Sequence, residues 1–192
     1  MKDNLFFPTV IGSDSNLELA ETMLPVARKY LDDQQHVTNA WGYKNTYTGG
    51  KGIEEFGDLK PFVDYINKKA IEYLERSGYN SDQVNFRINI FASEMFDGNS
   101  HPIHSHANSI LSGIFYLQVP EGSSSITFYD PRTHYDSISL PKREHHYFNW
   151  QEAYLNPEPG LFLIWQSWLR HSVPANKSKE GRITLVFNIA WA

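Results

Sequence analysis

The stretch SILSGIFYLQVPEGSSSITFY, residues 109–129, decides the fold class of this chain. Two runs rich in β-branched and aromatic residues stand on either side of a Pro-Glu-Gly-Ser segment, a pattern typical of two strands joined by a turn. Similar runs, separated by Gly, Pro, Asn and Asp, fill the chain from residue 84 onward. We therefore predict strands at residues 84–96, 109–119, 124–129, 137–140, 145–149, 160–166, 171–173 and 182–191.

The first part of the chain has the periodicity of helices. Apolar residues recur at helical spacing over residues 17–31, after Ser13, Asp14 and Ser15, whose side-chain oxygens are suited to cap a helix N-terminus. A second helix is predicted over residues 60–76, with Gly78 as its C-terminal stop. Two helices followed by about eight strands predict an α+β fold in which the helices back one face of a β-sandwich or barrel.

Size and composition favour one domain and restrict the chemistry. The 192 residues, 41% hydrophobic and 20% charged, predict a single domain over 1–192, with 1–83 as helical support and loop and 84–192 as the β core. The chain has no Cys, so disulfides, thiolate nucleophiles and Cys-held metal centres are excluded, and any metal must bind His, Asp or Glu.

Charge and hydropathy give expectations about partners and location. The net charge of -5 gives no signal for nucleic acid or an anionic membrane, because binding them requires clustered Lys and Arg. No stretch is long and apolar enough to span a bilayer, and the N-terminal apolar run is too short for a signal peptide. We therefore expect a cytoplasmic protein.

Clustered histidines provide the main candidate for a functional site. Three of the eight His fall within SHPIHSHANS, residues 100–109. In an extended segment His104 and His106 point to one face, and two imidazoles on one strand form half of a site for Fe, Zn, Cu or Ni. His171, which follows the apolar run after Gly160, is the best candidate for a third ligand.

The histidines also have simpler explanations. HxH pairs occur by chance and in surface loops, so this pair alone favours metal binding only slightly. For His101, a role beside the metal or substrate and a purely structural role weigh equally. We interpret the remaining histidines as structural: His36, His134, His145 and His146.

The strands around these histidines carry the motifs of a known family. In chain order they are HxH, SGIFYL, ITFYDP, PGLFLIW, LRHSVP and RIT, and the similarity extends from residue 89 to the C-terminus. This set resembles the 2-oxoglutarate- and Fe(II)-dependent oxygenases, especially the short prolyl-hydroxylase-like branch known from phage and marine bacteria. The resemblance implies a double-stranded β-helix (jelly-roll) core, Fe(II) and 2-oxoglutarate as cofactors, and molecular oxygen as a further reactant. A phage-encoded protein acting in the host cytoplasm fits it as well.

The resemblance also implies roles for individual residues. His104 and His171 would be metal ligands, and His106 stands where the family normally has Asp or Glu, so that it would be the third ligand. Arg182 would pair with the far carboxylate of 2-oxoglutarate, because a guanidinium matches a carboxylate with two parallel hydrogen bonds. No catalytic residue is expected beyond the metal ligands. Further contacts with the cosubstrate are expected from Tyr116, Thr184 and Asn89.

A histidine in place of the carboxylate changes the charge of the site. Three neutral imidazoles leave Fe(II) with its full charge, which a dianionic cosubstrate would neutralise, whereas an Asp would cancel part of that charge beforehand. The change makes zinc occupancy or an inactive relative more credible than usual. Glu94, Asp97 and Asp130 are alternative sources of a carboxylate, although none has the family's spacing.

The expected activity is hydroxylation of a protein residue, prolyl-like, or of a small molecule. Loops over residues 32–57 and 130–146 are expected to select the substrate, which the sequence does not identify, and the oligomeric state is equally unknown. Aromatic side chains are candidates for the cavity walls, although ordinary packing explains each equally well: Trp41, Tyr43, Trp165 and Trp168.

Two other functions remain open at this point. One is a cupin-type metal protein, because Gly98 followed by HxH resembles the first cupin motif, although the Glu expected near Ile110 is missing. The other is a non-catalytic module that keeps the barrel and binds a ligand without metal. Iron content and 2-oxoglutarate binding distinguish these functions from that of an oxygenase.

Overall fold

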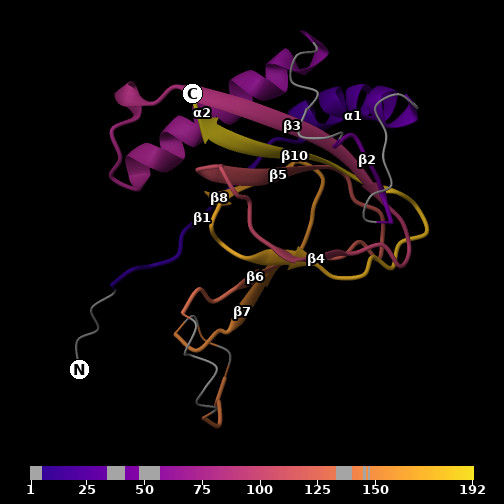
Figure 1. The fold of residues 1–192 in the computed structure, drawn as a ribbon. Helices are drawn as coiled ribbons and strands as arrows, with labels where there is room; N and C mark the ends of the chain where they lie inside the picture. Colours follow the sequence, from indigo (N-terminus) through magenta and orange to yellow (C-terminus); the bar gives the residue numbers. More distant parts are fainter. Residues whose placement is uncertain (1–5, 34–41, 48–56, 133–139, 145, 147) are drawn as a thin grey trace.

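Two antiparallel sheets lie face to face, and two helices cover the outer face of the larger sheet (Figure 1). The computed structural model describes residues 6–33, 42–47, 57–132, 140–144, 146 and 148–192, and the statements below concern these residues. This arrangement is the double-stranded β-helix, with helices on one sheet, that the sequence predicts. The two sheets enclose an interior between them, and the candidate site lies there.

The larger sheet forms the centre of the fold. Its middle strands are buried on both faces, because the helices cover one face and the smaller sheet covers the other. In spatial order its strands are β1 (Ile11–Ser15), β8 (Leu161–Gln166), β5 (Leu111–Gln118), β10 (Arg182–Trp191), β3 (Phe86–Met95) and β2 (Lys44–Asn45).

The smaller sheet closes the opposite side of the interior. It brings together strands that are far apart in the chain, so that the histidine segment lies beside the strand that begins with His171. In spatial order its strands are β4 (His101–His104), β9 (His171–Val173), β6 (Ile126–Tyr129) and β7 (Glu152–Leu155).

The helices α1 (Leu17–Asp32) and α2 (Lys60–Arg76) turn their apolar sides toward the larger sheet. Phe62 of α2 illustrates the packing: its ring centroid lies 5.3 Å from that of Phe115 on β5 and 6.1 Å from that of Phe187 on β10. Two short 3-10 helices flank α2, at Gly57–Leu59 and Ser81–Gln83. The helices therefore supply one half of a core whose other half comes from alternate residues of the strands.

Gly113 on β5 shows how tightly this core is packed. It is paired with Phe187 on β10, and a Cβ at this position would overlap the Phe187 ring and the carbonyl oxygen of Leu163. A side chain here would force the backbones apart, so the Ser-Gly-Ile sequence in the middle of a strand is a packing requirement.

Several predicted elements are confirmed, and one boundary is corrected. The second helix, β9 and β10 have the predicted bounds, and Gly78 follows α2 with φ 82°. The predicted N-cap of the first helix is wrong: Ser13, Asp14 and Ser15 belong to β1, and Asn16 accepts the hydrogen bond from the Leu19 amide at 3.0 Å. The reason is that pairing of β1 with β8 continues to the residue just before the cap.

Other differences concern short segments. Residues 137–139, 145 and 147 of two predicted strands lie outside the described residues, as do most of the two predicted substrate loops and Trp41. The described remainder of those strands is not assigned to a strand, and at residues 146–149 the Asn149 amide donates to the His146 carbonyl in a turn. The short strands β2, β4 and β7 were not predicted.

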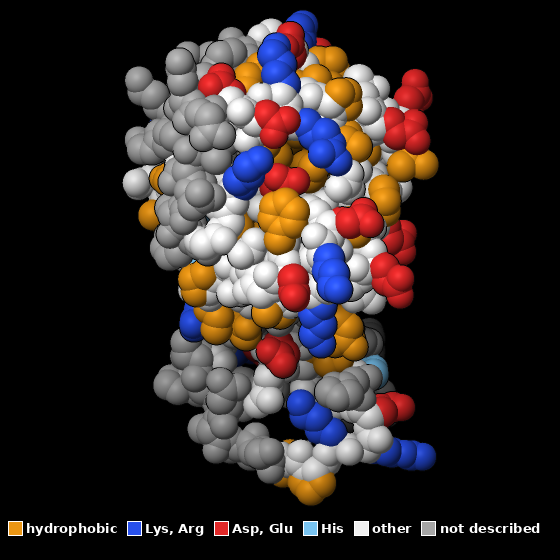
Figure 2. Space-filling view, turned by 90° about the vertical axis from the view of Figure 1, so that its right-hand side faces the viewer, with side chains coloured by type: hydrophobic (Ala, Val, Ile, Leu, Met, Phe, Trp, Pro, Cys, Tyr) orange, Lys and Arg blue, Asp and Glu red, His pale blue; other side chains and the backbone are white. Residues whose placement is uncertain are grey.

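The surface follows the composition. Figure 2 shows one side of the molecule, on which basic and acidic side chains of the described residues are intermingled. No helix in the described part of the chain has the length and apolar character needed to cross a membrane.

Candidate active site

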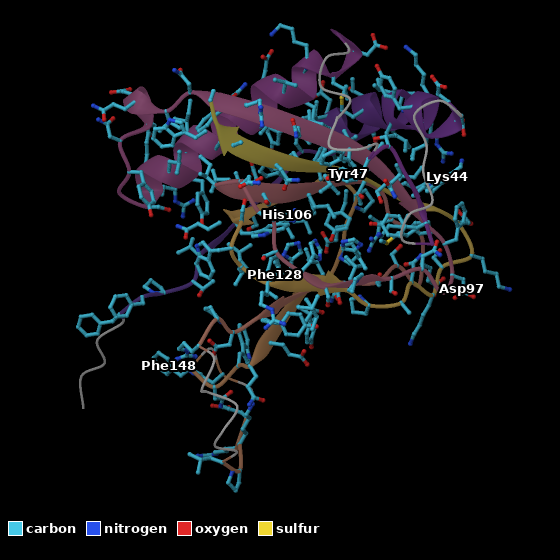
Figure 3. The ribbon with its side chains drawn as sticks, viewed as in Figure 1. Lys44, Tyr47, Asp97, His106, Phe128 and Phe148 are labelled. Atoms are coloured by element: carbon cyan, nitrogen blue, oxygen red, sulfur yellow. The ribbon has the colours of Figure 1, made fainter. Side chains whose placement is uncertain are left out.

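A cavity of about 570 Å³ lies between the two sheets. Its walls come from alternate residues of β3 and β10, from the β4 and β9 strands, and from the segment around Tyr43 and Tyr47. Figure 3 shows His106 in the space between the sheets. The cavity therefore contains the histidine segment that the sequence singles out.

Three imidazoles converge inside this cavity. Antiparallel pairing of β4 with β9 places His104 directly opposite His171, and His106 follows two residues later. One nitrogen atom from each ring lies within 4.8 Å of the others, and Nε2 of His106 is 3.2 Å from Nε2 of His171. Nitrogen ligands of a common metal ion lie about 3 Å apart when each is about 2.1 Å from the ion. The cluster is thus close to the geometry of a metal site.

Backbone carbonyls fix the orientation of two of these rings. Nδ1 of His104 donates to the carbonyl oxygen of Pro102 at 2.8 Å, and Nδ1 of His171 donates to that of Leu169 at 2.9 Å. A proton on Nδ1 leaves the lone pair on Nε2, which is the tautomer that binds a metal. Both rings are therefore held ready to offer Nε2 to one ion.

Burial keeps the imidazoles neutral. Burial, together with a smaller effect of the neighbouring imidazoles, lowers the pKa of His106 to about 3 and that of His171 to about 4. Burial also lowers the pKa of His104. Neutral imidazole is the form that coordinates a metal, so the ligands need not lose a proton at pH 7.

The described carboxylates do not join the cluster. Glu94 lies 3.5 Å from the ammonium of Lys44, and Asp130 pairs with Arg132. Figure 3 shows Asp97 at the edge of the molecule, far from His106. Among the described residues, the three histidines form the one group able to hold a metal, so its ligands are all neutral.

Arg182 lies in the same cavity and is 2% exposed. Its Nη1 donates to the carbonyl and the hydroxyl of Ser124, at 2.9 and 3.1 Å, and its Nη2 donates to Sδ of Met95 at 2.9 Å. Within the described part of the chain no carboxylate pairs with it, and its Nε has no partner. A buried cation without a counter-ion is costly, so this site is built to receive an anion.

Tyr116 adds to this unsatisfied polar environment. Its ring lies 5.8 Å from Cζ of Arg182, its hydroxyl is fully buried, and that hydroxyl has no partner among the described residues. Burial raises the pKa of Tyr116 to about 12, so the hydroxyl remains protonated and available as a donor. An anion bound at Arg182 could accept from it.

Comparison with known proteins identifies the family. Residues 89–188, slightly more than half of the chain, match the family model described as "Putative 2OG-Fe(II) oxygenase". The chain belongs to this family. It is a 2-oxoglutarate- and Fe(II)-dependent oxygenase, and Fe(II) and 2-oxoglutarate are its cofactors. No curated protein matches the oxygenase in sequence.

Solved structures share the fold of the oxygenase. A prolyl-4-hydroxylase from Pseudomonas putida has a TM-score of 0.67 at 10% identity, over 96% of this chain and 94% of that one. The epimerase SnoN, solved with Fe3+, alpha ketoglutarate and nogalamycin RO, has a TM-score of 0.63 at 15% identity, over 96% and 80%. A Trichoplax adhaerens prolyl hydroxylase, solved with a hypoxia inducible factor peptide, has a TM-score of 0.59 at 12% identity, over 94% and 83%. At these identities the likeness establishes the fold.

Of the other residues predicted to contact the cosubstrate, one lines the cavity and another does not. Thr184 lines it, beside Tyr116 in the register of β10 and β5. Asn89 on β3 stands opposite Asn188 and is not among the described residues that line the cavity. The assignment of Asn89 and Tyr116 as cosubstrate contacts stays a prediction.

Some of the aromatic residues predicted to form the cavity walls line the cavity, and one does not. Tyr43 and Trp165 line the cavity. The hydroxyl of Tyr43 lies 3.0 Å from Nδ1 of His101, whose ring meets that of His104 edge-on at a centroid distance of 4.2 Å. Trp168 is 52% exposed and lines an outer groove beside α2 instead.

Sequence reasoning missed several polar residues of the site. Ser124, which binds Arg182, lies 58 residues from it in the chain and carries no local signal. Asn188 is different: it follows Arg182 by six residues on one strand and so occupies the same face, which the period of two would have revealed.

Proposed function

We propose that His104, His106 and His171 hold the Fe(II) of this oxygenase, and that Arg182 and Thr184 bind the far carboxylate of 2-oxoglutarate. One observation carries the proposal: a cluster of neutral imidazoles and a buried guanidinium without a carboxylate partner among the described residues share one cavity. The first suits a divalent metal, and the second suits a carboxylate.

The side chains would position the cofactors and keep water away from them. Bound Fe(II), 2-oxoglutarate and O₂ supply the oxidising chemistry: one oxygen atom enters a substrate C–H bond as a hydroxyl group, and 2-oxoglutarate gives succinate and CO₂. The carbonyls of Pro102 and Leu169 keep His104 and His171 in the metal-binding tautomer. Arg182, and the hydroxyl of Tyr116 behind it, fix one end of the cosubstrate so that its other end faces the histidines.

The neutral ligand set fits a dianionic cosubstrate. Three imidazoles bring no charge to the metal, so the two carboxylates of 2-oxoglutarate balance the charge of Fe(II) without any help from the protein. The positive charge of Arg182 then adds to the attraction for the far carboxylate. Cosubstrate binding, in this proposal, depends on the metal more strongly than in a site that already contains an Asp.

The proposed substrate is a protein residue, prolyl-like, or a small molecule. The prolyl-4-hydroxylase from P. putida and the peptide-bound prolyl hydroxylase from T. adhaerens, which share the fold, support the prolyl-like version. We place the reaction in the cytoplasm, with 2-oxoglutarate and molecular oxygen as partners.

The test is spectroscopic. Anaerobic protein is mixed with Fe(II) and then with 2-oxoglutarate, and the weak visible charge-transfer band of the chelate is recorded, followed by succinate formation on admission of air. We expect the band in the wild type and its loss in His171→Ala. His106→Asp should keep the band and His106→Ala should weaken it, because the aspartate restores a third ligand and the alanine does not.

Asn67→Ala, on α2 at the outer side of the larger sheet, is the matched control and should behave as wild type. A wild-type protein that binds Fe(II) but shows no band would contradict the proposal. So would an unchanged band and unchanged iron content in both His106 variants, since another group would then be the third ligand.

A further inference from the structure

The side chains on the cavity face of β10 are spread along the cavity, and they distinguish its two ends. Arg182, Thr184, Val186 and Asn188 all line the cavity from this one strand. Six residues of extended chain span about 20 Å, so Asn188 lies far from Arg182. Asn188 therefore lies at the opposite end of this strand face from the guanidinium that is proposed to hold the far carboxylate of 2-oxoglutarate.

Strand register places Asn188 at the metal end. Asn188 is paired with Ser112 on β5, and Ser112 is paired with Trp165 on β8. The Trp165 ring lies 4.8 Å from the ring of His171. Asn188 therefore belongs to the half of the cavity in which the substrate must approach the metal.

A buried pair of serines fixes the side chain of Asn188. The Ser112 hydroxyl donates to Oδ1 of Asn188 at 2.8 Å, and the Ser167 hydroxyl donates to that of Ser112 at 2.7 Å. Both serines are at most 1% exposed, and the carbonyl of Ser167 also accepts from the His106 amide at 3.0 Å. The side-chain carbonyl of Asn188 thus points toward β5, and the two serines connect it to the segment that carries His106.

The other end of this amide is left for a ligand. With Oδ1 bound to Ser112, the Nδ2 group faces the cavity, and no described residue accepts from it. A fixed N–H₂ donor on a cavity wall selects a hydrogen-bond acceptor, and a site that hydrogen-bonds its substrate discriminates strongly against one that lacks the matching group.

The charge of the cavity restricts what that acceptor can belong to. Among the described side chains that line the cavity, Arg182 is the one Lys, Arg, Asp or Glu, and the proposed function assigns three of the lining histidines to the metal. In the proposed function, Arg182 binds the far carboxylate of 2-oxoglutarate. A substrate group that enters the metal end would then meet neutral hydrogen-bond donors and apolar walls. The apolar walls include Ile114, Trp165 and Val186. Burying a charge there without a partner would be costly.

We infer that Asn188 is a specificity-determining residue that donates through Nδ2 to an amide carbonyl of the primary substrate, and that the substrate enters the metal end as an uncharged, amide-bearing group. Ser112 and Ser167 are positioning residues that hold the asparagine in the donating orientation. The inference rests on the proposed function, because the part of the cavity that is available to the substrate is defined by where 2-oxoglutarate binds. A peptide backbone and a small neutral amide offer the same group.

The experiment measures how added compounds stimulate 2-oxoglutarate turnover. Wild-type holoenzyme with Fe(II) and saturating 2-oxoglutarate is mixed with three pools: tripeptides that are N-acetylated and C-amidated, small neutral amides, and free amino acids. Succinate is quantified, and products are searched by mass for one added oxygen atom. We expect stimulation by at least one amide pool and none by the zwitterionic amino acids. Which amide pool acts distinguishes a peptide from a small molecule.

The variants then test the role of Asn188 itself. Asn188→Ala should lower the apparent second-order rate constant for the stimulating pool by about tenfold, while the dissociation constant for 2-oxoglutarate, from the charge-transfer band, changes less than twofold. Ser112→Ala should give a smaller loss in the same rate constant, because the amide is no longer held in place. Asn67→Ala should match wild type in both measurements.

Each contrary result has a distinct meaning. Stimulation by free amino acids, or no stimulation by either amide pool in an enzyme that binds 2-oxoglutarate, overturns the substrate class. An equal response to amides in Asn188→Ala, or a large loss of 2-oxoglutarate affinity in it, overturns the role of Asn188. If the wild type shows no charge-transfer band, the proposed function fails and the inference fails with it.

Discussion

The two faces of β10 have different functions: one belongs to the core and the other lines the cavity. Toward the helices, alternate residues are apolar and 0% exposed, and they join the main core: Ile183, Leu185, Phe187 and Ile189. Toward the smaller sheet, the residues between them line the cavity: Arg182, Thr184, Val186 and Asn188. Side chains of a strand alternate between faces, so one ten-residue strand can build the fold and the site without compromise between them. We therefore expect substitutions on the two faces to have separable effects.

The largest effect is expected on the core face. Phe187→Ala removes a ring that stacks on Phe162 at 5.2 Å and meets Phe62 at 6.1 Å. Truncating a buried Phe leaves a cavity and lowers the free energy of unfolding by about 3–5 kcal/mol. Urea denaturation measures the loss. Molecules that remain folded should bind 2-oxoglutarate with nearly wild-type affinity, because the ring lies on the opposite face from Arg182.

Phe187→Leu is the milder partner of this variant. It keeps part of the buried volume, so its loss of stability should be smaller than that of the alanine variant. A large change in cosubstrate affinity in the leucine variant, with little change in stability, would contradict the separation of the two faces.

On the cavity face, Arg182→Met should reverse this pattern. Removing one partner of a buried charge pair costs about 2–5 kcal/mol of binding, which corresponds to a loss of 2-oxoglutarate affinity of roughly thirtyfold or more. Without the ligand, the same change removes a buried cation that has no described counter-ion, so the stability of the protein should not fall. Titration of the charge-transfer band measures the first quantity, and thermal unfolding of the metal-free protein measures the second.

Iron content provides the control, because the three histidines are untouched and should bind Fe(II) as before. If the metal-free variant were strongly destabilised, the contacts of Arg182 with Ser124 and Met95 would be structural, and the assignment of the guanidinium as a carboxylate site would lose its main support.

The same alternation explains what could be predicted from the sequence. The bounds of β10 are predictable because it is a long run rich in strand-forming residues, and His104 and His106 are predictable as a pair because of the period of two. β4 is not: it has four residues, one of them Pro102, and it becomes a strand only because β9 pairs with it. Tertiary pairing of this kind leaves no trace in a local pattern.

The site follows the same rule. A motif within one segment can be predicted from the sequence, whereas a contact between distant segments cannot. Ser124, which binds Arg182, and the two serines behind Asn188 come from other segments of the chain. The contact between Arg182 and Ser124 spans 58 residues, and the contact between Ser112 and Asn188 spans 76. The wrong N-cap prediction for α1 has the same origin. Ser13, Asp14 and Ser15 pair with β8 as part of β1, and this long-range pairing is not visible in the local sequence.

A smaller effect on the cavity face is expected from Thr184→Val. The substitution conserves the shape of the side chain and removes the hydroxyl, which lines the cavity beside Tyr116 and has no hydrogen bond within the described part of the chain. If this hydroxyl donates to the cosubstrate carboxylate, its loss costs about 1 kcal/mol, or roughly a fivefold rise in the dissociation constant for 2-oxoglutarate. Stability should change little. An unchanged dissociation constant would remove Thr184 from the carboxylate site and leave Arg182 as the principal contact.

The smallest effect concerns the attachment of α2 to the edge of the larger sheet. Oδ2 of Asp14 on β1 lies 2.6 Å from the ammonium of Lys69 on α2 and accepts from the Tyr65 hydroxyl at 2.9 Å. The hydrogen bond from Lys69 lowers the pKa of Asp14 below its ordinary value of 3.8. A lowered pKa in the folded state adds stability above the unfolded pKa, and this contribution disappears as the pH falls through the folded pKa.

Asp14→Asn should therefore lower the free energy of unfolding by no more than ~1 kcal/mol at pH 7, because the pair is partly exposed and screened by solvent. The difference from wild type should shrink below about pH 4 and vanish at lower pH, as denaturation measured across that range would show. Asp64→Asn is the matched control: it breaks an exposed pair with Lys60 on the same helix and should cost less. Neither variant should alter 2-oxoglutarate affinity, since both act on the helix-covered side of the sheet, and a change there would mean that the two faces of the sheet are coupled.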